Sequence, residues 1–120
     1  MSWTIKNIVD SARELLKDED AEEYRYTDES LIRAINASVN VVIQKRPDLF
    51  KLREGFPQFT VDDIEDGTAF PIDVMYFTST VFFVCGYAEL RDDEFSDENR
   101  AYTLIRKFET DLTGGANGAA

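Results

Sequence analysis

The chain of 120 residues has the length of a single domain, and its 43% hydrophobic and 12% aromatic residues are ordinary for a globular protein. Its 24 acidic and 13 basic residues give a formal net charge of -11 and a pI of about 4.3. A field of this sign repels free nucleic acid, which counts against a general DNA- or RNA-binding role.

We expect neither a secretion signal nor a membrane-spanning segment from the sequence pattern. Its opening stretch, MSWTIKNIVD, lacks a basic segment followed by an apolar one, so we expect no signal peptide. The longest uncharged stretch, 74–88, is too short and too rich in Thr, Ser and Gly to cross a bilayer. The single cysteine, Cys85, cannot form an internal disulfide, and its apolar neighbours predict a buried structural thiol. We therefore expect a soluble protein of a reducing compartment.

The first predicted element is an amphipathic helix over residues 4–17. Its apolar residues recur at helical spacing along one face: Ile5, Ile8, Val9, Ala12, Leu15 and Leu16. The run DEDAEE follows at 18–23, with five acids in six positions. Like charges at this density repel each other, so we expect a solvated link to the second helix.

The second helix is the clearest element of the sequence. Thr27 is a good N-cap, and Asp28 and Glu29 follow it at the positive end of the helix dipole. Pro47 ends the helix because it lacks an amide proton and restricts the residue before it. One apolar stripe runs between these ends, formed by Leu31, Ile32, Ile35, Val39, Val42 and Ile43.

The helical period is lost between residues 48 and 72. QFTV (58–61) and TAFP (68–71) have the composition of two short strands, and Asp66-Gly67 is a typical turn. The pattern predicts a short β-hairpin between the second and third helices.

Two more helices are predicted in the second half. Residues 73–91 are apolar on nearly every side and favour a buried central helix, with a strand as the alternative. Ser96 can cap a last helix whose buried stripe is Ala101, Leu104, Ile105, Phe108 and Leu112, with Arg106 and Lys107 on its far side. The predicted fold is mainly α: a four-helix bundle with a β-hairpin inserted between helices 2 and 3. It forms one domain over 1–113, followed by a flexible C-terminal tail over 114–120.

Residues that carry out chemistry are scarce. Histidine is absent, so Cys85 has no histidine to activate it, and no glycine-rich phosphate loop is present. The acidic run 62–66 fails as a calcium loop, because Gly67 at the sixth position would put Ile64 at a ligand position. We expect no enzymatic activity, no metal site and no cofactor.

Residues 45–53, KRPDLFKLR, carry four basic residues against one acid. This basic patch either complements the dipole at the end of the second helix or meets an acidic neighbour, such as another copy of the chain. Asn36 and Asn40, one turn apart, either bond to a neighbouring loop at the edge of the core or specify a contact at a subunit seam.

The order of four stretches along the chain resembles that of a known family. They are IKNIVDSARELLKD (5–18), YTDESLIRAINASVNVVIQKRPDLF (26–50), TAFPIDV (68–74) and NRAYTLIRKFETDL (99–112). The second has a Tyr-Thr-Asp start, an Asn-Ala and an Arg-Pro stop, and the third resembles a hairpin return before a third helix. Together they cover half of the chain and resemble the head-to-tail adaptor (connector) proteins of tailed bacteriophages.

This resemblance implies a structural virion protein that works without catalysis. Such adaptors form a ring, usually of twelve copies, beneath the portal, where they extend the DNA channel and provide a docking platform for tail proteins. The implied partners are the portal protein, neighbouring copies and a downstream tail or tail-nozzle protein, and the genome passes without specific binding. The implied location is the neck of the virion, after assembly in the host cytoplasm, with no membrane involved.

Two sets of contact residues follow. The resemblance implies a portal contact on the last helix and tail, at Phe108, Leu112, Thr113, Gly114, Gly115 and Asn117. The basic patch and the hairpin predict a subunit interface at Lys45, Arg46, Phe50, Lys51, Arg53, Phe59 and Val61.

Two other functions stay open. An acidic inhibitor that imitates nucleic acid would need its acids at phosphate-like spacing over one face, whereas the sequence places them in loops and helix starts at 18–23, 62–66 and 92–98. A small enzyme or cation-binding protein is the other alternative.

Overall fold

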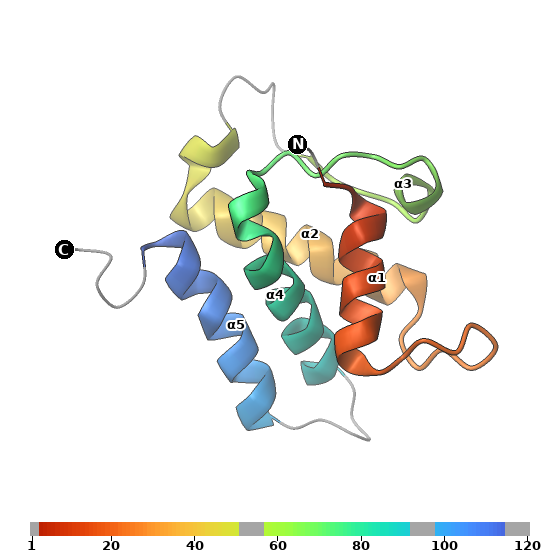
Figure 1. Cartoon of the computed structure of the whole chain (residues 1–120). Helices are drawn as coiled ribbons and strands as arrows, with labels where there is room; N and C mark the ends of the chain where they lie inside the picture. The colour runs from red at the N-terminus through yellow and green to blue at the C-terminus, as the bar shows by residue number, and fades with distance from the viewer. Residues whose placement is uncertain (1–2, 51–56, 92–97, 115–120) are drawn as a thin grey trace.

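The protein is mainly α-helical. The computed structural model describes residues 3–50, 57–91 and 98–114. In these ranges it has five α-helices, namely α1 (Ile5–Leu16), α2 (Asp28–Lys45), the one-turn α3 (Asp62–Glu65), α4 (Phe77–Leu90) and α5 (Glu98–Leu112). Two 3-10 turns accompany them, η1 (Pro47–Phe50) and η2 (Val74–Tyr76). α1, α4 and α5 lie side by side with α4 in the middle, and α2 crosses behind them (Figure 1).

The first two helices begin where local capping chemistry predicts. The Thr4 hydroxyl accepts from the backbone N–H of Asn7 at 3.1 Å, and the Asn7 side chain accepts from the Thr4 N–H at 2.9 Å. Thr27 caps α2 by accepting from the N–H of Ser30 at 3.0 Å. The predicted N-cap of the second helix is therefore confirmed, as is its end before Pro47.

The central position of α4 confirms the prediction of a buried helix. α4 contacts α1, α2 and α5, and most of its residues are buried. It starts at Phe77, directly after η2, and the Asp73 side chain caps that 3-10 turn by accepting from the N–H of Met75. The strand alternative for this segment is wrong.

Gly86 lies where α4 closely approaches α5. A Cβ atom there would lie 2.6 Å from the carbonyl oxygen of Ala101 and 3.0 Å from the Ile105 side chain. Only a residue without a side chain lets the two backbones come this near. The α4–α5 contact thus depends on one hydrogen atom in place of a methyl group.

The predicted stripe of the last helix faces the core. Ala101, Leu104, Phe108 and Leu112 are buried and Ile105 is half-buried. The helix ends before Gly114, which adopts a left-handed φ of 87°. The predicted cap at Ser96 and most of the predicted tail, 115–120, lie outside the described residues.

The predicted β-hairpin is wrong. Neither of its expected strands forms; instead the polypeptide between them makes the single turn of α3, and Gly67 leaves that turn with a φ of 67°. The return segment pairs with the N-terminal residues of the chain. The N–H of Phe70 donates to the carbonyl of Trp3 at 2.8 Å, and the N–H of Ile5 donates to the carbonyl of Thr68 at 2.9 Å. These hydrogen bonds flank an isolated antiparallel bridge between Thr4 and Ala69.

Distant polar partners explain why the hairpin does not form. The Asn36 side chain, from α2, accepts from the N–H of Phe59 at 2.8 Å and donates to its carbonyl at 3.0 Å. Asp63 holds the loop around α3, accepting from the N–H of Thr60 and from the hydroxyl of Thr68, each at 2.7 Å. The backbone groups at Phe59 that a strand partner would have used are therefore occupied. Asn36 thus takes the core-edge role predicted for it, whereas Asn40 is exposed.

Candidate functional site

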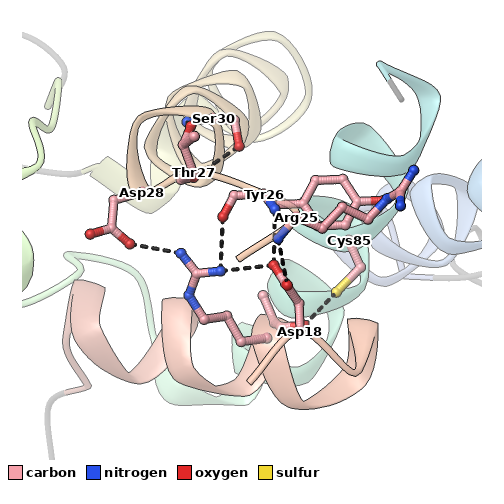
Figure 2. Close-up of polar contacts among 9 residues, drawn as sticks. Asp18, Arg25, Tyr26, Thr27, Asp28, Ser30 and Cys85 are labelled. Atoms are coloured by element: carbon pink, nitrogen blue, oxygen red, sulfur yellow. Dashed lines mark hydrogen bonds and ion pairs between the residues drawn. The ribbon is translucent and has the colours of Figure 1, made fainter. Parts of the chain in front are cut away.

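A buried arginine organises the junction between α1 and α2. Arg13 is only 4% exposed, and its guanidinium donates to the carboxylate of Asp18 at 2.9 Å, to the carbonyl of Tyr26 at 2.9 Å and to Asp28 at 2.8 Å. Its charge also lies 3.5 Å from the centre of the Tyr24 ring. Asp18, Tyr26 and Asp28 converge on this one group (Figure 2). We call these residues the Arg13 cluster.

The Arg13 cluster also closes the loop between the two helices. Asp18 is 7% exposed and accepts from the N–H groups of Arg25 at 2.8 Å and Tyr26 at 3.0 Å. The Asp18 carboxylate therefore holds the two ends of the loop between α1 and α2 together. The prediction of a solvated link is wrong at Asp18. Its carboxylate accepts a charge-assisted hydrogen bond from the buried Arg13 guanidinium in place of hydrogen bonds from water.

Between the clamped ends, an acidic turn projects into solvent. Glu19, Asp20, Glu22 and Glu23 are all exposed. Asp20 shapes the turn: its carboxylate accepts from the N–H of Glu22 at 3.0 Å, and its carbonyl accepts from the N–H of Glu23 at 2.9 Å. We call residues 19–23 the acidic loop, a preformed patch of four negative charges.

An open groove of about 860 Å³ runs between α4 and α5. α4 contributes Thr78, Ser79 and Phe82, and α5 contributes Thr103, Arg106, Lys107 and Thr110. Arg46, Met75 and Gly114 are also among its lining residues. Met75 is 70% exposed, so one side of the groove presents a large apolar group to water. The groove combines apolar and cationic surface.

The charge of the groove is positive although the protein is strongly acidic. Its lining includes three cations, Arg46, Arg106 and Lys107, and one acid, Asp111. Asp111 accepts a hydrogen bond of 2.6 Å from the hydroxyl of Ser79. Arg106 and Lys107 are exposed and form no ion pair with any residue of the described ranges, although Lys107 lies 6.0 Å from the ring centre of Phe82. We call this surface the basic groove.

Arg46 joins the ends of two helices. Its guanidinium donates to both carboxylate oxygens of Asp48, at 2.9 Å each, and to the carbonyl of Leu112 at 2.7 Å. Lys45 lies 3.4 Å from the carboxylate of Glu109 on α5. Lys45 and Arg46 thus hold the C-terminal ends of α2 and α5 together, a role within the chain that neither interpretation of the basic patch predicted.

The other residues predicted for the subunit interface differ in their exposure. Phe50 and Phe59 are buried in the core of the single chain, so their prediction as contact residues is wrong: they have no surface to offer a neighbour. Val61 is half-buried beside that core. Lys51 and Arg53 lie outside the described residues.

The residues predicted for the portal contact also differ in their exposure. Phe108 and Leu112 are 1% and 0% exposed, because they face inward from α5, and their prediction as surface contacts is wrong. Thr113 and Gly114 are exposed at the end of α5. Gly115 and Asn117 fall outside the described part of the chain.

Cys85 is a buried thiol of the core. Burial, followed by the nearby Glu89 carboxylate, raises the pKa of Cys85 to about 12, and its thiol donates to the carbonyl of Ala12 at 3.6 Å. Within the described ranges, no three acids or cysteines are placed to share a metal ion. No helix described there is long and apolar enough to cross a bilayer.

Sequence patterns did not identify the Arg13 cluster or the basic groove. Arg13 had one signal: it follows Ala12 at the edge of an apolar stripe, where an unpaired charge would be costly. Arg106 and Lys107 were placed on the far side of the last helix, but their groove exists only because α4 packs beside them. Comparisons with protein-family models, with curated proteins and with solved structures found no match to the chain.

Proposed function

We propose that this protein is a head-to-tail adaptor of a tailed bacteriophage, a structural subunit that forms a ring beneath the portal and provides a platform for tail proteins. It works by docking and not by catalysis. The observation that carries the proposal is the sequence pattern of residues 26–50, with its Thr-Asp start and Arg-Pro stop.

The role of Arg46 supports this proposal. In the sequence the residue is part of a motif that ends a helix; in the fold it also donates to the last carbonyl of α5. The residues after Leu112 therefore leave the domain from a point that α2 holds in place. An adaptor that reaches its portal with a C-terminal segment needs such a fixed exit, because a loosely held arm pays more entropy on docking. Phe108 and Leu112 would then anchor α5 from within, and contact would fall to Thr113 and the residues after it.

The charge of the chain is compatible with a channel wall. A ring multiplies the net charge of -11 by its number of copies. Negative surface facing the DNA would repel phosphate and let the genome slide without binding.

The proposal is tested by assembly onto a portal. Purified protein, labelled on an engineered surface cysteine, would be mixed with portal-containing particles from the same source, and sedimentation would separate bound from free protein. We expect co-sedimentation and, in negative-stain images along the channel axis, an added ring. A chain truncated after Gly114 should lose most of this binding. If the full chain never co-sediments with the particles, the proposal is wrong.

A further inference from the structure

We infer that the basic groove binds the acidic loop of a second copy of this chain, so that neighbouring subunits join head to tail. The inference rests on the proposed function for its setting, a ring, and names the contact that would build that ring. The groove cations Arg106 and Lys107 and the acidic loop have no role in the first proposal.

Charge complementarity selects the occupant. The basic groove presents the cations Arg106 and Lys107, which form no ion pair within the described ranges. The acidic loop presents four exposed carboxylates within five residues. In a protein this acidic most surfaces repel each other, so a local positive groove decides which faces can meet.

The position of the two surfaces makes the contact intermolecular. The acidic loop follows α1, and the groove lies along α5, on the other side of the central helix α4 (Figure 1). The Arg13 cluster clamps both ends of the loop, so the loop cannot reach the groove of its own chain. A contact between two different faces repeats from copy to copy and closes into a ring when the rotation permits.

The loop is also shaped in advance for binding. Hydrogen bonds to Asp20 hold the turn of the loop, and Asp18 holds its two ends. The loop therefore loses little conformational entropy when it docks. The groove adds apolar surface from Met75 and Phe82, against which Ala21 and the stems of the glutamates can pack. Because the charges are near the surface, added salt should weaken the contact.

Cross-linking between single-cysteine chains tests the contact. The native Cys85 is buried, so an engineered surface cysteine is the reactive one. Thr110→Cys lies in the groove and Glu22→Cys in the loop; mixed as separate chains and oxidised, they should form a mixed disulfide dimer. Replacing either with Arg33→Cys, on the exposed face of α2, is the matched control, and we expect it to lower the yield about tenfold.

Charge exchange makes the test specific. Arg106→Glu with Lys107→Glu in the Thr110→Cys chain should reduce the mixed dimer about tenfold, and Glu19→Lys with Glu23→Lys in the Glu22→Cys chain should restore it. Circular dichroism confirms that each variant is folded. A yield no higher than that of the Arg33→Cys control, or a charge exchange that restores nothing, overturns the inference. A chain that carries both Thr110→Cys and Glu22→Cys and forms a disulfide within itself, with no dimer, also overturns it.

The two proposals fail separately. Specific cross-linking by a protein that never binds a portal particle would overturn the adaptor function and leave the contact standing. Normal rings on the portal from the Arg106→Glu, Lys107→Glu variant would overturn the contact and leave the adaptor function standing.

Discussion

The Arg13 cluster and the basic groove place cations in opposite situations. Arg13 is buried and its guanidinium is engaged by two carboxylates, a carbonyl and an aromatic ring of the same chain. Arg106 and Lys107 are exposed beside apolar surface and pair with no acid of the described ranges. A cation whose partners lie within the chain stabilises the fold, whereas one without them is available to another molecule. Stability measurements on the two sites should therefore diverge.

The largest effect is expected at Arg13. Arg13→Met keeps much of the side-chain volume but leaves the buried Asp18 carboxylate without its cation, and removing one partner of a buried pair costs about 3 kcal/mol. The free energy of unfolding from urea titrations would measure the loss. Asp28→Asn is a milder matched change, because Asp28 is half-buried and the contact to Asp18 remains. If Arg13→Met is no less stable than the native chain, the cluster does not hold the loop.

The next effect concerns the packing that forms the groove. Gly86→Ala places a methyl group 2.6 Å from the Ala101 carbonyl, so α4 and α5 must separate, at a cost of about 2 kcal/mol. Thr78→Ala, an exposed position on the same helix, is the control and should change stability little. Thermal unfolding followed by circular dichroism would compare them. Equal melting temperatures for the two variants would show that the helices do not depend on this close approach.

A smaller, pH-dependent effect on stability is expected at Asp63 in the one-turn helix α3. The Thr68 hydroxyl, and then the Thr60 N–H, stabilise its ionised carboxylate and lower its pKa below the usual 3.8. A lowered folded pKa gives stability that is present above the unfolded pKa and is lost as the pH falls through the folded value.

Asp63→Asn should therefore cost about 1 kcal/mol at neutral pH, and the difference from the native chain should shrink as the pH falls below the usual carboxyl pKa of 3.8 and through the lowered folded pKa. Urea titrations at several pH values would follow it, with Asp62→Asn, at an exposed neighbour, as the control. A loss that stays constant down to low pH would contradict the role of the charge.

The smallest effect on stability is expected in the basic groove. Arg106→Met with Lys107→Met removes two exposed charges that form no ion pair within the described ranges, so the free energy of unfolding should change by less than about 0.5 kcal/mol. Measured beside Arg13→Met, this variant completes the comparison. A loss as large as that of Arg13→Met would mean that the groove cations stabilise the chain itself, and the distinction between the two sites would disappear.

Local patterns were enough to predict the long helices. Thr27 and Pro47 bound α2 through capping and the missing amide proton, effects that act within a few residues. The burial of α4 followed from an apolar composition on every side. The hairpin could not be predicted correctly, because the backbone of Phe59 is bonded by Asn36, 23 residues earlier, and no local propensity records such a partner.

Local sequence was therefore sufficient to specify where the four long helices lie and which of their faces are apolar, since helix periodicity and caps are short-range properties. The burial of Asp18 beside exposed acids, and the groove lined by Arg106 and Lys107, arise instead from the packing of distant segments. They depend on the contact of the Arg13 guanidinium with Asp18 and on the close approach of the α4 and α5 backbones at Gly86. Burial and electrostatic pairing are set by which segments meet in space, and distant segments meet only when the chain has folded.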